Sequence, residues 1–267
     1  MVSDSTRVPA RPRHLAPKYA AQFEDESIAR AYHTRPPYPA ELFTFLASLQ
    51  PAGPRAILDL GCGTGDIAIG LADRADRIDA IDPSRAMLRV ARARPGADHS
   101  SLHWTCATAE AFALGGPYSL IVAAESFHWM DWEAVGARIA GALRSQAFLA
   151  LVRGRTLQDV AWSAALAELI PRYSTNRDYQ PYDVVDELTR RRLFTEVGRR
   201  CTASVAFEQS IDDYVESFHT RNGFSRARMT SAAAAEFDSA LRRLVAPHIS
   251  DGVVRAKVRA SVVWGVP

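Results

Sequence analysis

The sequence predicts an α/β protein built on a largely parallel sheet. Between residues 56 and 152, short apolar segments alternate with helical patterns, which is the order in which parallel strands and their covering helices follow one another. The apolar segments are hydrophobic throughout, as is typical of strands buried on both faces. A chain of 267 residues is long enough for one such domain with a substantial core.

The apolar and helical patterns place each element of this domain. Strands are expected over residues 56–60, 78–81, 102–106, 120–124 and 148–152, with helices over 66–75, 84–94 and 131–143. After Val152 the alternation stops, and the patterns predict helices over 157–170, 182–194, 211–220 and 231–245, with strands over 202–207 and 253–263. The long helical insertion predicts a lid over the carboxyl edge of the sheet.

The N-terminal region predicts an arm followed by a helical flap. Residues 1–17 are rich in Pro and Arg and have few periodic apolar positions, so we expect a mobile arm. A helix over 23–32 should end at Arg35-Pro36-Pro37-Tyr38-Pro39, and another should cover 40–49. We divide the single domain 18–267 into an N-terminal helical flap (18–50), a core with the ligand loop (51–155), a helical lid (156–195) and a C-terminal part that completes the sheet (196–267).

Composition excludes several functional classes. The net charge is +2, with 32 basic and 30 acidic residues, so general nucleic-acid binding is not expected. The three cysteines lack any Cys-x-x-Cys spacing, which argues against a zinc site and suits a reducing compartment. No window approaches the ~20 apolar residues of a membrane span. We therefore expect a cytoplasmic protein, monomeric or homodimeric, that binds no metal, no nucleic acid and no membrane.

The stretch from Asp59 to Asp66, "DLGCGTGD", predicts a ligand loop after the first strand. In open parallel sheets, ligands bind outside the carboxyl ends of strands. A Walker-type loop needs a Gly-Lys pair that is absent here. A dinucleotide loop needs Gly or Ala where Asp66 stands, because a carboxylate there repels the pyrophosphate. A nicotinamide oxidoreductase is therefore the least favoured alternative, and Asp66 is expected to satisfy its own helix terminus.

Asp82 ends the second predicted strand, 21 residues after Gly61. A carboxylate at this place can accept hydrogen bonds from both hydroxyls of a ribose. Pro83 then begins the next helix, whose Met87 and Leu88 could pack beside a purine or simply belong to the core.

Four stretches in this order resemble the class I S-adenosylmethionine-dependent methyltransferases: Asp59–Gly65, Ile81–Leu88, Thr108-Ala109-Glu110 and Tyr118–Trp129. Phe23, Tyr32, the segment Arg35–Pro39 and His128-Trp129 are similar to the small-molecule branch that includes trans-aconitate and natural-product methyltransferases. The resemblance implies a Rossmann-like sheet of seven strands, the last two forming an antiparallel hairpin.

The resemblance also implies roles for particular residues. Gly61 and Gly63 would approach the methionine part of S-adenosylmethionine, Asp59 would order its ammonium through water, and Asp82 would hold the ribose. The remaining residues implied around the cofactor are Met87, Ala109, Glu110 and Ala123. Aromatic faces favour a sulfonium cation, which makes Tyr32 and Tyr38 candidates in the flap. Arg35 could pair with the carboxylate of the cofactor or with an acidic substrate.

His128 is the candidate catalytic residue, because it follows a strand's carboxyl end and imidazole titrates near neutral pH. It could act as a general base, position the substrate, or only pack. Methyl transfer from a sulfonium depends mainly on alignment, so such an enzyme need not own a base. The candidates for the substrate pocket are Tyr38, Trp129, Arg153, Phe218 and Arg221, with Tyr32 shared with the cofactor.

The expected function is methyl transfer from S-adenosylmethionine to a small molecule, more in keeping with secondary than central metabolism, with S-adenosylhomocysteine as product. One alternative is a carboxylate O-methyltransferase like the trans-aconitate enzymes, which predicts at least two inward arginines among Arg35, Arg153 and Arg221. The other is a protein that keeps the cofactor site without methyl transfer.

Overall fold

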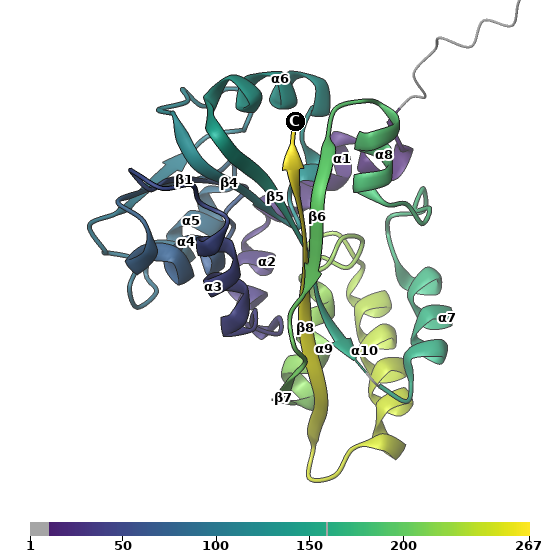
Figure 1. Cartoon of the computed structure of the whole chain (residues 1–267). Helices are drawn as coiled ribbons and strands as arrows, with labels where there is room; N and C mark the ends of the chain where they lie inside the picture. The colour runs from purple at the N-terminus through teal and green to yellow at the C-terminus, as the bar shows by residue number, and fades with distance from the viewer. Residues whose placement is uncertain (1–10, 159) are drawn as a thin grey trace, which may run out of the picture.

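The computed structural model describes residues 11–158 and 160–267. In these residues one mixed sheet forms the centre of the molecule, and helices lie against it (Figure 1). The strands are β1 (Ala56–Leu60), β2 (Arg77–Asp82), β3 (Leu102–Cys106), β4 (Tyr118–Ala124), β5 (Leu143–Gln158), β6 (Thr195–Cys201), β7 (Val205–Ser210) and β8 (Val253–Val266). The predicted α/β class is confirmed.

The helices fall close to the predicted ranges, and short 3-10 turns join several of them. The α-helices are α1 (Pro17–Ala20), α2 (Glu26–Ala31), α3 (Ala40–Ser48), α4 (Asp66–Leu71), α5 (Arg85–Arg92), α6 (Trp132–Ala142), α7 (Ser163–Tyr173), α8 (Val184–Arg190), α9 (Ile211–His219) and α10 (Ser231–Val245). The 3-10 turns are η1 (Arg13–Leu15), η2 (Ala21–Glu24), η3 (Tyr32–Thr34), η4 (Ala72–Arg74), η5 (Phe127–Trp129) and η6 (Ala246–His248). Among the described residues, no helix combines the length and the hydrophobicity that a membrane span requires.

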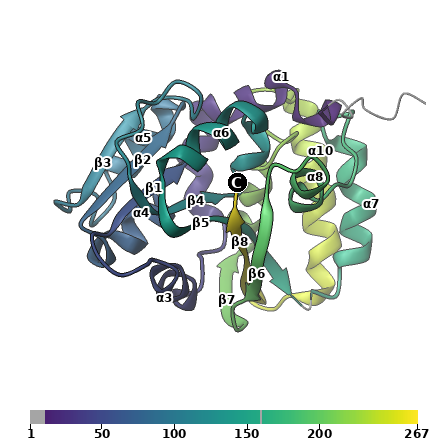
Figure 2. The same ribbon diagram turned by 45° about the horizontal axis from the view of Figure 1, so that its top comes forward.

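The strand order places a crevice beside β1. The order is β3-β2-β1-β4-β5-β8-β6, with β7 also paired to β8 (Figure 2). Neighbours from β3 to β5 run parallel, and β8 runs antiparallel to β5, β6 and β7. The order reverses between β1 and β4, which is the switch point at which open sheets of this kind bind ligands.

The predicted number of seven strands is wrong, because the described part of the sheet contains eight. The edge position is shared by two strands: β6 pairs with residues 261–266 of β8, and β7 pairs with residues 253–258. The sequence missed β6, whose "TEVGRRC" is charged and largely exposed and so lacks an apolar pattern. The predicted antiparallel pairing of the last two strands is confirmed by β7 and β8, with α9 and α10 between them in the chain.

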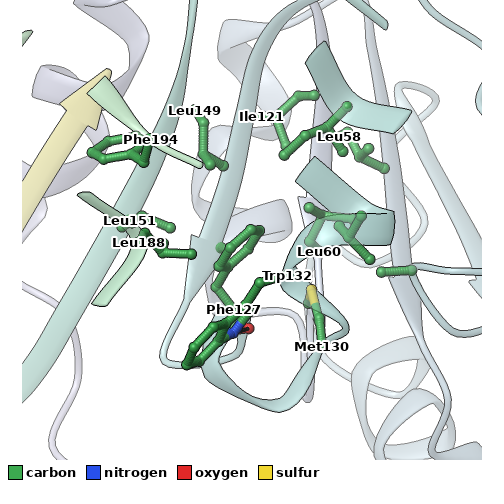
Figure 3. Packing of buried hydrophobic residues seen from close by; sticks show 14 of the residues in the cluster. Leu58, Leu60, Ile121, Phe127, Met130, Trp132, Leu149, Leu151, Leu188 and Phe194 are labelled. Atoms are coloured by element: carbon green, nitrogen blue, oxygen red, sulfur yellow. Dashed lines mark hydrogen bonds between the residues drawn. The ribbon is translucent and has the colours of Figure 1, made fainter. Parts of the chain in front are cut away.

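Alternate residues of the strands build one core on each side of the sheet. Leu58 and Ile121 face the layer that contains α6 and α8, while Ile57 and Leu120 pack with residues of α3 and α4. Figure 3 shows the first of these cores, where side chains of β1, β4 and β5 lie beside Leu188 and Phe194. Two independently packed faces fix the sheet rigidly beneath its carboxyl edge.

The region after β5 has an apolar core of its own. Trp162 precedes α7 and packs with residues of α9 and α10, including Tyr214, Phe218 and Phe237. In both ribbon views α7 and α10 lie side by side, away from β1 to β3 (Figures 1 and 2). The helical layer therefore includes α9 and α10 as well as the predicted lid helices.

The predicted mobile arm, residues 1–17, is described only from residue 11 onward. Residues 1–10 lie outside the described residues. From residue 11 the chain packs on the molecule: Leu15 is 2% exposed within the core shared by β1 and α6, and the Arg11 guanidinium donates a hydrogen bond to the carbonyl of His128. Residues 11–17 are thus held by burial and hydrogen bonding.

Candidate functional site

A cavity of about 1000 Å³ opens at the carboxyl ends of β1, β2, β4 and β5. Its walls come from the N-terminal segment, the glycine loop, the loop after β4, a bulge in β5, and helices α7 and α9. This volume is at the top of the range for pockets that hold one drug-sized ligand. All predicted site residues line it except Asp59 and Tyr38.

The glycine loop owes its shape to left-handed backbone at Gly61 (φ 70°) and Gly63 (φ 54°). The amides of Gly61 and Cys62 donate to the Ile81 carbonyl, each at 2.9 Å, which joins the loop to β2. A Cβ on Gly61 would lie 2.6 Å from Ser126 Cβ, whereas a Cβ on Gly63 would meet only a Tyr32 ring atom at 4.0 Å. Gly61 therefore allows close packing of the protein, and Gly63 leaves open space at the cavity wall.

Asp82 is fixed in place by the backbone on either side of it. One carboxylate oxygen accepts from the Gly63 amide at 2.9 Å, and the other accepts from the Ser84 amide at 2.8 Å. Burial raises the pKa of this carboxyl. Because each carboxylate oxygen can accept more than one hydrogen bond, Asp82 stays able to bind a pair of hydroxyls from the cavity.

Met87, Ala109 and Glu110 form the wall beyond Asp82. The Ser84 hydroxyl caps α5 by accepting from the Met87 amide at 3.2 Å, and the Glu110 carboxylate accepts from the Asp131 amide at 2.9 Å. Met87 is 2% exposed and packs with Ile28 of α2. It therefore both lines the cavity and belongs to the core, while its packing beside a purine stays a prediction.

The structure does not bring Asp59 and Tyr38 to the cavity surface. Asp59 is 1% exposed, and neither carboxylate oxygen has a hydrogen bond of normal geometry among the described residues. Burial, to which Asp82 adds, raises the pKa of Asp59 to about 8, although the nearby Ala68 amide opposes the rise. Tyr38 is turned inward from the proline segment, and the Arg155 guanidinium covers its ring at 4.4 Å.

Asp66 does more than satisfy the terminus of α4. Its carboxylate pairs with Arg155 at 2.7 Å and also with Arg94. Burial alone would raise the pKa of Asp66, but these two arginines outweigh burial and hold that pKa below its ordinary range. The sequence analysis did not predict Arg155 as a site residue, because its position depends on a bulge in β5.

That bulge also explains how β5 reaches the cavity. The register of β5 against β8 shifts between Arg153 and Thr156, and Gly154 has a φ of 60°. Bulges re-aim side chains next to binding sites, and here Arg153, Gly154 and Arg155 all line the cavity. Arg153 pairs with Asp183 at 2.5 Å.

His128 lies in η5 beside aromatic rings. Its ring centroid is 4.7 Å from that of Trp129 and 6.4 Å from that of Tyr182. Burial, to which Arg11, His14 and Arg35 add, lowers the pKa of His128 to about 4, and Glu125 opposes this shift. No described residue forms a hydrogen bond with the ring nitrogens. The imidazole is therefore neutral at pH 7, without an orienting carboxylate.

Glu125 is a cavity residue that the sequence reasoning missed. It follows β4 with a φ of 52° and lies 3.4 Å from Arg35 Nη1. Arg35 itself donates from Nε to the Thr220 hydroxyl at 2.8 Å and from Nη1 to the Tyr32 hydroxyl at 3.1 Å. A carboxylate directly after a strand at the switch point was the available signal for Glu125.

The comparisons with known proteins agree with this geometry. A family model described as "Methyltransferase domain" matches residues 57–146. An uncharacterized methyltransferase of Mycobacterium tuberculosis is 34% identical over 169 residues, which cover 62% of this chain and 63% of that protein. A structure titled as a putative type II methyltransferase from Anaeromyxobacter dehalogenans has a TM-score of 0.62 and 25% identity, covering 86% of this chain and 96% of that one.

These matches and the fold support a methyltransferase domain of the class I S-adenosylmethionine-dependent type, which the family model locates at residues 57–146. A domain of this type is consistent with the strand order, the antiparallel β8 and the glycine loop between β1 and α4. A trans-aconitate 2-methyltransferase of Streptomyces avermitilis is 34% identical over 107 residues, 39% of each chain. The match to the mycobacterial methyltransferase spans 63% of that relative's length.

Proposed function

We propose that this protein transfers a methyl group from S-adenosylmethionine to a small molecule by in-line displacement. The observation that carries the proposal is the Asp82 carboxylate, held by the amides of Gly63 and Ser84 beside the open face of Gly63. A carboxylate so placed suits a ribose, and the bare glycine leaves room for the chain that joins the ribose to the sulfonium.

The residues present fit this cofactor. Asp59 is buried with unpartnered oxygens and would compensate the cofactor's ammonium, with water between them. Tyr32 offers an aromatic face near Gly63, which favours a sulfonium by about 0.5–2 kcal/mol. Met87, Ala109 and Glu110 would surround the adenine, with Ala123 at the end of β4. When bound, S-adenosylmethionine supplies a methyl group that is already activated.

The protein's contribution would then be alignment and exclusion of water. Proximity and orientation can lower a reaction barrier by ~7–11 kcal/mol, and alignment of an acceptor atom in line with the methyl group can supply several kcal/mol of this. His128 would act as a weak base or position the acceptor, because a conjugate acid with a pKa of about 4 is far from the optimum for a base at pH 7. Trp129 and Phe218 would form the apolar wall beside the acceptor.

The carboxylate O-methyltransferase alternative is supported by three arginines in the cavity wall, Arg35, Arg153 and Arg221, and by the similarity to a trans-aconitate 2-methyltransferase. Two of the three are occupied, Arg35 by Thr220 and Glu125, and Arg153 by Asp183. The binding-only alternative predicts cofactor affinity without turnover.

Titration calorimetry with S-adenosylhomocysteine tests the site. Asp82→Ala should weaken binding more than tenfold, because two ribose hydrogen bonds to a charged group are lost. Asp98→Ala, at an exposed position outside the cavity, is the matched control and should leave affinity unchanged. Equal affinity in the wild type and Asp82→Ala would refute the site. Transfer of labelled methyl from S-adenosylmethionine to a panel of small acceptors separates an enzyme from a binding module.

A further inference from the structure

We propose that Arg221 anchors an anionic group of the acceptor, a carboxylate, phosphate or sulfate, and that the apolar body of the acceptor lies along α7 and α9. The inference rests on the proposed function, since it concerns the acceptor half of the same cavity. It makes Arg221 a specificity-determining residue.

Arg221 lies two residues after α9 and lines the cavity. Its guanidinium covers the Phe218 ring, with 3.9 Å between the central carbon and the ring centroid. Stacking of this kind uses the flat face of the group, whereas its five N–H donors lie in the plane. Among the described residues, none accepts a hydrogen bond from these donors and none forms an ion pair with them.

The other cavity arginines are bound to the protein. Arg153 pairs with Asp183, and Arg155 pairs with Asp66. Arg35 donates to Thr220 and Tyr32 and lies 3.4 Å from Glu125. Within the described residues, Arg221 is thus the one arginine of the cavity wall whose hydrogen-bond donors are all unused.

The surroundings of Arg221 favour an anion. Burial, to which Arg35 adds, lowers its pKa to about 10, with Tyr214 and Glu125 in opposition. The guanidinium is still charged at pH 7. Arg221 is half-buried. An unpaired cation that is partly removed from water carries a desolvation cost, and perturbed groups in clefts are concentrated at functional sites. An anionic ligand group would remove this cost and use the free donors.

Charge is distributed unevenly over the cavity wall. Glu24, Asp82 and Glu110 line the cavity with the residues proposed for the cofactor's adenosine, whereas Arg221 follows α9 and has Arg35 and Glu125 as charged neighbours. The wall near the lid is apolar and is lined by Leu157, Val160, Leu166, Ile170, Tyr214 and Phe218. A ligand that fits this half of the cavity has an apolar body and one anionic end.

The carboxylate of S-adenosylmethionine is the competing partner for Arg221, and the experiment separates the two. Binding of benzoate, phenyl phosphate and benzamide is measured by calorimetry on protein saturated with S-adenosylhomocysteine. The wild type should bind at least one anion at least tenfold more tightly than benzamide, and the better anion identifies the preferred group. Arg221→Met should lose this preference and keep its affinity for S-adenosylhomocysteine, while Arg221→Lys should keep part of the preference.

Each contrary result has a separate meaning. A tenfold loss of S-adenosylhomocysteine affinity in Arg221→Met would overturn the inference and assign the guanidinium to the cofactor. No anion preference in the wild type, including no binding of any of the three probes, would also overturn it. Failure of S-adenosylhomocysteine to bind the wild type would instead refute the proposed function.

Thermal unfolding of the ligand-free protein provides a test that needs no acceptor. If Arg221 serves a ligand, Arg221→Met should have a melting temperature equal to or above that of the wild type, because an unpaired charge has been replaced by an apolar side chain. Arg243→Met, the same change at an exposed arginine of α10, is the control. A marked fall in melting temperature for Arg221→Met alone would show a structural role and overturn the inference.

Discussion

The Arg155 guanidinium lies 2.7 Å from the Asp66 carboxylate and joins the bulge of β5 to the first residue of α4. The Arg155 side chain is 7% exposed and that of Asp66 is 22% exposed. This pair ties the part of the cavity wall formed by β5 to the helix that follows the glycine loop, two parts of the chain that are 89 residues apart.

Asp66→Asn should be strongly destabilising because it leaves the buried Arg155 uncompensated. Removal of one partner of a buried ion pair costs about 3–5 kcal/mol, and Arg155 Nε already lacks a partner. We expect the free energy of unfolding, measured by urea denaturation at pH 7, to fall by at least ~2 kcal/mol, since Asp66 is not fully buried.

Asp73→Asn is the control for this change, because the Asp73 side chain is 93% exposed. It should alter the free energy of unfolding by no more than about 0.5 kcal/mol. If Asp66→Asn changes the free energy of unfolding as little as Asp73→Asn does, the Asp66–Arg155 pair does not hold the bulge of β5 in place.

Gly63→Ala and Gly61→Ala should separate cofactor binding from folding. Both glycines have positive φ, so each alanine costs about 1–2 kcal/mol of backbone strain. The Gly63 methyl would enter open cavity space and should weaken binding of S-adenosylhomocysteine while the protein stays folded. The Gly61 methyl would meet Ser126 at 2.6 Å and should reduce stability further.

Gly252→Ala is the matched control for strain alone, because Gly252 has a φ of 67° and nothing lies within 4 Å of the added carbon. Calorimetry and thermal unfolding of all three variants provide the comparison. Unchanged affinity in Gly63→Ala would place the cofactor away from this loop.

The sequence alone predicted much of the fold and most of the residues named for the site that line the cavity. β1 and β3 have their predicted bounds. For β1 the reason is that a strand buried on both faces gives a continuous apolar segment, whereas the residues of β3 are half-buried or exposed. Gly63 and Asp82 lie together because a glycine turn and a strand-end carboxylate are local features. β6 was missed because an exposed edge strand has no apolar pattern. Arg155 was missed because its position depends on a bulge that only the register against β8 reveals.

The pH dependence of turnover should show whether His128 is a base. Burial lowers its pKa to about 4, so the free imidazole is neutral throughout the neutral range and loses its ability to accept a proton only below that pKa. We expect kcat/KM for a neutral acceptor to show no acidic limb near pH 6.5, where an ordinary histidine titrates. If kcat/KM of the wild type did fall below about pH 6.5, and this fall disappeared in His128→Asn, the result would contradict the lowered pKa and the neutral state of the ring.

The kinetic parameters of His128→Asn distinguish the two roles of the ring. A base should lose at least ~10²-fold in kcat, whereas a residue that only positions the acceptor should mainly raise KM. His103→Asn, the same change at an exposed histidine of β3 outside the cavity, is the control and should leave both parameters unchanged. Normal values of both parameters in His128→Asn would leave the ring a purely structural role.

Asp59 should release a proton when S-adenosylmethionine binds. Its pKa of about 8 in the ligand-free protein means that it is largely protonated at pH 7. A cofactor ammonium nearby would lower that pKa, so binding should release protons, and affinity should rise with pH until the pH reaches about 8. Calorimetry in two buffers of different ionisation enthalpy measures the number of protons released.

Asp59→Asn is the matched control, since it keeps the shape of the side chain and removes the titration. The same shift affects stability, because the pKa of Asp59 is higher in the folded protein than its unfolded value of about 3.9. The contribution to the free energy of unfolding that is present below about pH 3.9 is lost as the pH rises toward 8. Asp59→Asn should flatten this loss, which is at most ~1.4 kcal/mol per pH unit. Asp59→Asn could remove the loss of stability with rising pH and still release protons when the cofactor binds. That result would show that the released proton comes from another group and that the cofactor's ammonium does not act on Asp59.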